Sequence, residues 1–179
     1  MKHLGLALLG AVAAAAFATP AAQAQRIGAV EDLVPAAFAT PPAAPRVRLV
    51  ERYGVVSNEV LETERGSAIG VRFVDDTVLR LGSESRVVLD RFVYNPRASN
   101  GELVMTLGRG TFRYISGQMP KDGVRIVTPS ATIGIRGTDF VVIVGAGGDT
   151  RLLPCERADV LIRPNNLPNT AVVTAGQSA

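Results

Sequence analysis

The chain has 179 residues, a formal net charge of +3, one histidine and one cysteine. Basic and acidic residues are interspersed with no run of like charge, which excludes the basic patch expected of a nucleic-acid-binding protein. The lone Cys155 cannot form an internal disulfide, so burial must hold the fold together. We expect this thiol to be buried or inert, with intermolecular pairing or a reactive thiol as the alternative.

The first 24 residues have the pattern of a cleavable signal peptide. Lys2 precedes an unbroken apolar run from Leu4 to Phe17, which is followed by Pro20 and the small-residue pattern Ala22-Gln23-Ala24. The run is shorter than the roughly 20 residues that span a bilayer, which disfavours the alternative of a membrane anchor. We therefore expect export, cleavage after about Ala24 and no membrane span in the mature chain.

Prolines dominate the next part of the chain. Residues 35–45 contain four prolines in eleven positions, a composition that forbids a helix and favours an extended path. The sequence predicts either an ordered surface loop or a linker here. We assign residues 25–46 to a Pro/Ala-rich N-terminal segment and residues 47–179 to a single β domain.

From Val47 onward, apolar residues recur with a period of two, which is typical of strands with one buried face. Turn-forming residues such as Asp75-Asp76 and Lys121-Asp122-Gly123 separate these runs about every 8–12 residues. The pattern predicts an all-β domain of short strands, built as a solenoid-like stack or a sandwich. Its last two strands are expected at Asp159–Ile162 and Ala171–Thr174. The clearest alternating positions are Val71 and Phe73, Leu79 and Leu81, Val87 and Leu89, Leu103, Met105 and Leu107, and Val124 and Ile126.

Few residue types suited to catalysis are present. The one histidine, His3, lies in the predicted signal peptide, so the mature domain would lack Ser-His-Asp, Cys-His and most zinc chemistry. Asp75 and Asp76 form the most obvious carboxylate pair, but we expect them to form a turn between strands. The glycines of Gly108-Arg109-Gly110 precede no helix that could bind a phosphate. The sequence therefore predicts no enzyme activity, no cofactor and no metal site.

The most distinctive stretch runs from Thr128 to Phe140. Ile133 and Ile135 face one side of the expected strand, so Gly134 leaves the opposite side bare. Gly137 can adopt a positive φ and could break or bulge the strand. The stretch is therefore a candidate corner between two strands.

Two interpretations of this corner remain open. In the structural one, Arg136 pairs with Asp139 and Thr138 bonds to backbone at the bend. In the functional one, the bare backbone and Arg136 contact a ligand. The candidate interaction or structural motif consists of Thr132, Arg136, Gly137, Thr138 and Asp139.

An ordered set of motifs resembles the FecR-type periplasmic domain, in the form found in exported proteins, over roughly residues 26 to 144. Val71–Gly82 is similar to the family pattern apolar-x-Phe-x-Asp-x-Ser/Thr-x-Leu-x-Leu-Gly, and Ala131–Thr138 resembles a second family motif. Residues 151–179 fit less well, because Pro154-Cys155 interrupts the pattern before Ala175-Gly176-Gln177. The other matching motifs are Thr40-Pro41-Pro42, Asn58–Thr63, Leu89–Pro96, Gly110–Gly117 and Thr128-Pro129.

The resemblance implies an all-β fold and a role in sensing or binding within the cell envelope. In better-known members, this domain follows a membrane span and a cytoplasmic anti-sigma segment, contacts an outer-membrane transporter and relays iron status. Here a predicted signal peptide replaces the cytoplasmic segment, so we do not extend the transcriptional role to this chain. The periplasm is the expected location.

Two classes of function follow. The leading hypothesis is a periplasmic protein-interaction or sensory module whose partner is an envelope protein. The alternative is a glycan- or peptidoglycan-binding protein, or a structural protein of the envelope. Sugar rings usually stack on aromatic faces, and the chain has no tryptophan and three tyrosines. Those tyrosines, Tyr53, Tyr94 and Tyr114, are expected to pack in the core or at strand edges.

Overall fold

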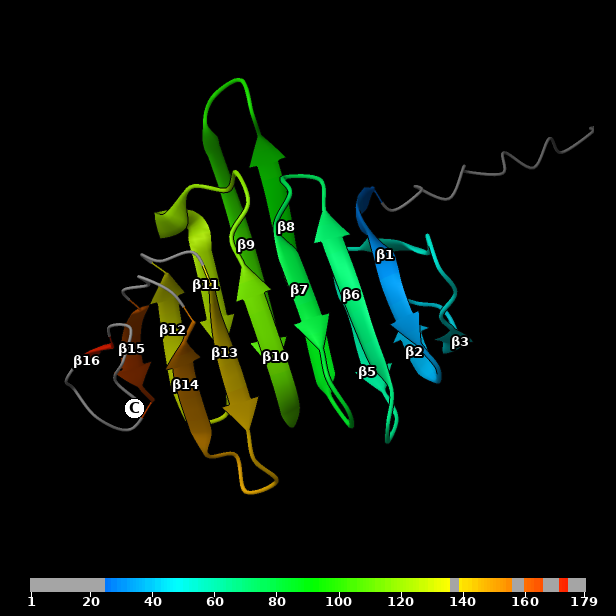
Figure 1. Ribbon diagram of the computed structural model, residues 1–179. Helices are drawn as coiled ribbons and strands as arrows, with labels where there is room; N and C mark the ends of the chain where they lie inside the picture. The colour runs from blue at the N-terminus through cyan, green and yellow to red at the C-terminus, as the bar shows by residue number, and fades with distance from the viewer. Residues whose placement is uncertain (1–24, 136–138, 156–159, 166–170, 174–179) are drawn as a thin grey trace, which may run out of the picture.

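Two β-sheets packed face to face make up the protein (Figure 1). The computed structural model describes residues 25–135, 139–155, 160–165 and 171–173. Within these residues, sheet A has seven strands in the order β14-β13-β10-β7-β6-β1-β4, and sheet B has nine in the order β16-β15-β12-β11-β9-β8-β5-β2-β3. A single 3-10 turn, η1 (Lys121–Gly123), accompanies them in the described part.

The bounds of the strands are as follows. Sheet A contains β1 (Arg26–Val34), β4 (Gly54–Val56), β6 (Ala68–Phe73), β7 (Val78–Leu81), β10 (Gly110–Ile115), β13 (Asp139–Val144) and β14 (Thr150–Pro154). Sheet B contains β2 (Ala37–Thr40), β3 (Val47–Arg48), β5 (Glu59–Thr63), β8 (Arg86–Asn95), β9 (Asn100–Leu107), β11 (Val124–Val127), β12 (Ala131–Ile135), β15 (Val160–Pro164) and β16 (Ala171–Val173).

The chain builds the two sheets in turn and advances from one end of the molecule to the other (Figure 1). After the β6–β7 hairpin in sheet A, it adds β8–β9 to sheet B, β10 to sheet A, β11–β12 to sheet B, and β13–β14 to sheet A. Only β10, a strand of sheet A, lies between β9 and β11 in the sequence. The chain therefore returns to sheet B in the direction of β9, and β9 and β11 are parallel. The all-β prediction is confirmed, and the molecule is a sandwich whose strands are added stepwise as in a solenoid.

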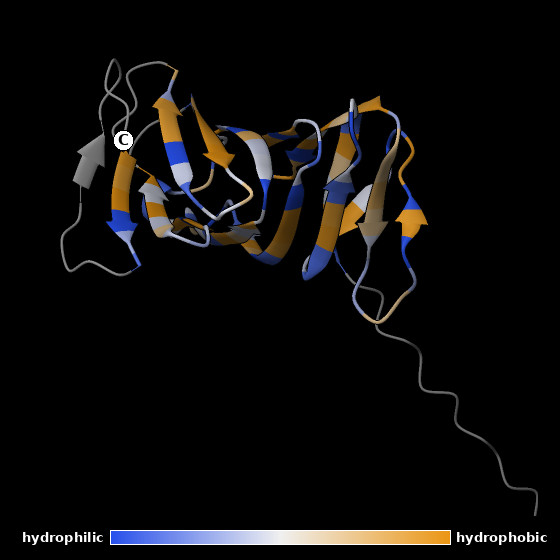
Figure 2. Ribbon diagram, turned by 90° about the horizontal axis from the view of Figure 1, so that it is seen from below, coloured by the Kyte–Doolittle hydropathy of each residue, from blue (hydrophilic) through white to orange (hydrophobic). Residues whose placement is uncertain are grey.

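The core lies between the two sheets and is filled by every second residue of the strands. Leu79 and Leu81 are buried and Arg80 between them is exposed; Leu103, Met105 and Leu107 are likewise buried. Seen from below, the strands form two layers along which hydrophobic and hydrophilic residues alternate (Figure 2). Phe73 of sheet A stacks on Phe92 of sheet B with ring centroids 5.5 Å apart, so aromatic contact joins the layers. Burial of such side chains contributes about 2–3 kcal/mol each.

The prediction of a loop or linker over residues 35–45 is wrong for its first part. Ala37–Thr40 forms strand β2, which pairs with β5, and Ala37 and Ala39 are buried. The period-two pattern of this segment consists of two alanines, Ala37 and Ala39. Alanine is too small, and two positions are too few, for the sequence to indicate a strand. Prolines are tolerated because they flank the strand and do not interrupt its hydrogen bonding.

A segment between β3 and β4 closes the N-terminal end of the sandwich. Leu49 is buried against the core, and Tyr53 packs at its margin. Behind them the fully buried carboxylate of Glu59 accepts hydrogen bonds from the Tyr53 hydroxyl at 2.7 Å and from the Val56 amide at 2.9 Å. Burial raises the pKa of Glu59, outweighing the two hydrogen bonds, which lower it. The sequence pattern gave no sign that this glutamate is internal.

The predicted Asp75-Asp76 turn is confirmed, and its first carboxylate is fully buried. One oxygen of Asp75 accepts from the Thr77 hydroxyl at 2.6 Å and from the Met119 amide at 3.1 Å, while the other accepts from the Thr77 amide at 3.3 Å. A Cβ on Gly117 would overlap the Asp75 carbonyl oxygen, so glycine is needed where the two segments meet. These contacts join the β6–β7 turn to the segment that leads into η1 and β11.

Replacing Asp75 should therefore destabilise the whole sandwich. We expect Asp75→Asn to lower the free energy of unfolding by roughly 2–3 kcal/mol, because an amide nitrogen cannot accept the donors that now converge on the carboxylate. Asp76→Asn is the matched control: Asp76 has a φ of 65°, a conformation that asparagine also tolerates. Urea denaturation of both variants, compared with the wild type, measures the difference. Equal midpoints for the two variants would contradict the role given to Asp75.

Candidate functional site: a groove centred on Gly134

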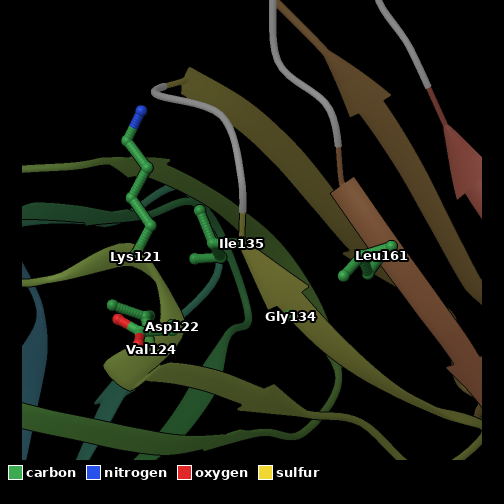
Figure 3. Close-up of a pocket in the computed structure, with 6 residues that line it drawn as sticks. All are labelled: Lys121, Asp122, Val124, Gly134, Ile135 and Leu161. Atoms are coloured by element: carbon green, nitrogen blue, oxygen red, sulfur yellow. The ribbon is translucent and has the colours of Figure 1, made fainter.

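Two adjoining hollows lie where η1, β11, β12 and β15 meet. The first has a volume of about 790 Å³ and the second about 310 Å³. In Figure 3, Gly134 and Ile135 lie between Lys121 on one side and Leu161 on the other. We call the two hollows together the Gly134 groove. Its lining residues are Lys121, Asp122, Val124, Arg125, Thr132, Gly134, Ile135, Leu161 and Arg163.

Gly134 creates the hollow because it faces outward from sheet B and has no side chain. Strand register places it between Arg125 on β11 and Leu161 on β15. The bare strand face predicted from Ile133 and Ile135, both buried, is confirmed. A Cβ built on Gly134 would have its nearest neighbour, the Leu161 Cβ, at 3.7 Å, which is ordinary van der Waals contact. Neither packing nor backbone conformation therefore requires glycine at this position.

The rim of the groove is basic and its floor is apolar. Arg125 and Arg163 are exposed, and no carboxylate of the described residues lies within ion-pair distance of either. Lys121 adds a third basic group, and Asp122 is the one carboxylate among the described lining residues. Leu161 supplies the accessible apolar surface, since Val124 and Ile135, which also line the hollow, are buried in the core. Such a surface can bind an anionic group and an apolar side chain together.

The sequence-predicted motif is divided between the two sheets. Thr132 lines the groove, and its hydroxyl donates to the Asn165 side-chain oxygen at 3.4 Å. Asp139 lies on β13 in sheet A, where it accepts two hydrogen bonds from Arg113 of β10, at 2.6 and 3.0 Å. Arg136, Gly137 and Thr138 lie outside the described residues, and with them the predicted Arg136–Asp139 pair.

The Arg113–Asp139 pair sets the charge state of the one motif carboxylate. The guanidinium of Arg113 holds the pKa of Asp139 below its ordinary value of 3.8, against the raising effect of partial burial. The arginine lies 26 residues away in sequence, and only the register of β10 with β13 brings the two together. Sequence reasoning therefore missed Arg113, as it missed Arg125, Leu161 and Arg163 of the groove.

The expectation that Cys155 is buried is wrong, because the residue is exposed. Cys155 directly follows Pro154, at which β14 ends, and its amide donates to the Asp139 carbonyl at 3.0 Å. The end of the strand at proline places the thiol at the surface instead.

The three tyrosines pack as expected. Tyr114 is buried and stacks on Phe140 with ring centroids 5.2 Å apart. Tyr53 and Tyr94 are partly buried against the core, and their hydroxyls donate to Glu59 at 2.7 Å and Gln118 at 3.3 Å. Their rings thus contribute to packing, and none of the three lines the Gly134 groove.

The Arg113–Asp139 pair should make stability depend on acid pH. Because the folded-state pKa of Asp139 lies below its unfolded value, the pair stabilises the fold above that value and the contribution is lost as pH falls. We expect Asp139→Asn to cost about 1 kcal/mol above about pH 5, with the difference vanishing in strong acid. Thermal unfolding across this pH range measures it.

Asp32→Asn is the control for this measurement, because the Asp32–Arg80 pair is exposed on both sides and should contribute little. A difference between wild type and Asp139→Asn that stays constant from neutral to acid pH would contradict the assignment.

In the described residues no group of three or more His, Cys, Asp or Glu side chains is placed to hold a metal ion. None of the helical structure in this part of the chain is long and apolar enough to cross a bilayer.

A search of curated proteins gives no match. The family model described as FecR protein matches residues 59–160, more than half of the chain and including most of the Gly134 groove. The chain therefore belongs to the FecR protein family.

Proposed function

We propose that this protein is a non-catalytic interaction or sensory module of the cell envelope, located in the periplasm and contacting its partner through the Gly134 groove. Membership of the FecR family supports a signalling type of module. The signal-peptide pattern of residues 1–24 supports export. The observation that carries the proposal is the groove itself, whose hollow depends on a glycine that the fold does not require.

The residues of the groove favour binding over catalysis. Among the described residues, Lys121 and Asp122 are its exposed titratable groups on η1, and Arg125 and Arg163 are its arginines. Arginine stays protonated in proteins, so it serves as a fixed positive charge and not as a proton donor or base. The one histidine of the chain, His3, belongs to the predicted signal peptide. Recognition of a partner is the chemistry that this set supports best.

A protein partner fits the groove better than a glycan does. Carbohydrate sites commonly present aromatic faces on which sugar rings stack, and the described residues that line the groove include no aromatic one. Leu161 instead offers aliphatic surface beside fixed positive charge. That combination matches an apolar side chain next to an acidic one.

In-cell photo-crosslinking tests this proposal. A photoreactive amino acid at Asp122, which lines both hollows, should form an adduct with one envelope protein, identified by mass spectrometry. The same probe at Arg72, on the outer face of sheet A, is the control position. Gly134→Val in the Asp122 probe chain should reduce the adduct severalfold, because the added side chain fills the hollow and valine suits a strand.

As a control, circular dichroism and thermal unfolding should show that the Gly134→Val chain is folded. Adducts from Arg72 equal to those from Asp122, or an Asp122 adduct that is unaffected by Gly134→Val, would show that the groove is not the contact surface.

A further inference from the structure

We propose that the occupant of the Gly134 groove is an extended acidic segment of a partner protein, in which one apolar residue lies between two carboxylates. This inference rests on the proposed function and specifies the chemistry of the partner. It follows from three features of the groove: the positions of its two arginines, the bare strand between them, and the pairing of arginines elsewhere in the molecule.

Strand register fixes where the two arginines stand on the outer face of sheet B. Arg125, Gly134 and Leu161 form one row across β11, β12 and β15. Val127, Thr132 and Arg163 form the next row across the same strands. The line from Arg125 to Arg163 therefore crosses β12 between Thr132 and Gly134, over the hollow that the glycine leaves.

The spacing of the arginines selects the form of the ligand. Two strand spacings across the sheet and a two-residue step along it place their Cα atoms about 12 Å apart. In an extended segment, residues i, i+2 and i+4 point to the same side, and i and i+4 are separated by about 13 Å. Carboxylates at i and i+4 can thus meet Arg125 and Arg163, while residue i+2 enters the hollow beside Leu161. The predicted motif is acidic-x-apolar-x-acidic.

The charge pattern of the molecule favours a carboxylate ligand. The described residues form eight arginine–carboxylate ion pairs, and the arginines involved all lie between Arg46 and Arg113. Arg125 and Arg163 have no such partner in the described part of the chain, and neither do Arg26, Arg48, Arg52, Arg97 and Arg151, but only Arg125 and Arg163 flank the groove. A planar guanidinium binds a carboxylate through two parallel hydrogen bonds, so an acidic partner segment complements both arginines.

Two further charges of the groove agree with this assignment. Lys121 lies at the η1 side and adds to the positive potential, and Asp122 beside it opposes that potential. Among the described residues, the lining then carries three basic groups and one acidic group. Asp122 also disfavours a ligand of dense negative charge spread over the whole groove, such as a polyanion, and favours one with separated charges around an apolar centre.

The test uses defined peptides and the purified mature protein. A fluorescein-labelled peptide containing Glu-Ser-Leu-Ser-Glu, flanked by glycine and serine, is compared by fluorescence anisotropy with a peptide carrying glutamine in place of glutamate. A third peptide carries alanine in place of leucine. At low salt the glutamate peptide should bind about tenfold more tightly than the glutamine peptide, and its affinity should fall as salt rises. The alanine peptide should also bind more weakly.

Variants connect this binding to the two arginines. The double variant Arg125→Gln, Arg163→Gln should lose the preference for glutamate, and Gly134→Val should weaken binding of every peptide. Arg48→Gln is the matched control, because Arg48 is also exposed on sheet B but lies on β3 at the opposite end of the molecule. All these positions are at the surface, so each variant should retain the wild-type melting temperature.

The outcomes separate this inference from the proposed function. Equal binding of the glutamate and glutamine peptides, or a preference that survives the double variant, would overturn the acidic ligand. Binding that is indifferent to the leucine, and that heparin competes away, would overturn it in favour of a polyanion. The Asp122 crosslinking is independent: an adduct there that persists in the double variant leaves the proposed function standing while this inference fails.

Discussion

The buried carboxylate of Asp75 is the contact on which the arrangement of the later strands depends. It accepts hydrogen bonds from its own turn and from the Met119 amide. The turn between β6 and β7 is thereby joined to the segment that follows β10 and leads into η1. Because a buried carboxylate without donors is very unfavourable, this segment has little freedom to move away. The position of η1, and with it one wall of the Gly134 groove, follows from that constraint.

The inward and outward faces of each sheet contribute differently to stability. Inward-facing residues fill a continuous apolar core and supply most of the stability. Outward-facing residues contribute little to stability, since exposed ion pairs are worth only about 0–1 kcal/mol. Leaving Arg125 and Arg163 without a carboxylate therefore costs the fold little. The attraction between either arginine and a carboxylate would be stronger where a partner covers the pair and excludes water.

Two buried carboxylates, Glu59 and Asp139, have pKa values shifted in opposite directions. Burial raises the pKa of Glu59, so its contribution favours the folded state at low pH and declines as pH rises. Arg113 lowers the pKa of Asp139, so that contribution is present at neutral pH and lost in acid. Glu59 closes the N-terminal end of the sandwich, and Asp139 lies toward the other end. The two carboxylates therefore contribute to the pH dependence of stability with opposite signs.

From Val47 onward the sequence by itself determined most of the strands, their turns and the residues of the core, because a period of two is a local property of the chain; it did not reveal β1 or β2. The bare face at Gly134 followed from the same alternation. Only the tertiary structure decided which strands are neighbours, and so placed Arg113 beside Asp139 and Arg125 and Arg163 around Gly134. It also placed Ala37–Thr40 in a strand, Glu59 inside and Cys155 outside. The physical reason is that a local pattern specifies which face of a strand is buried, whereas a binding surface on a sheet is composed across strands that lie far apart in the chain.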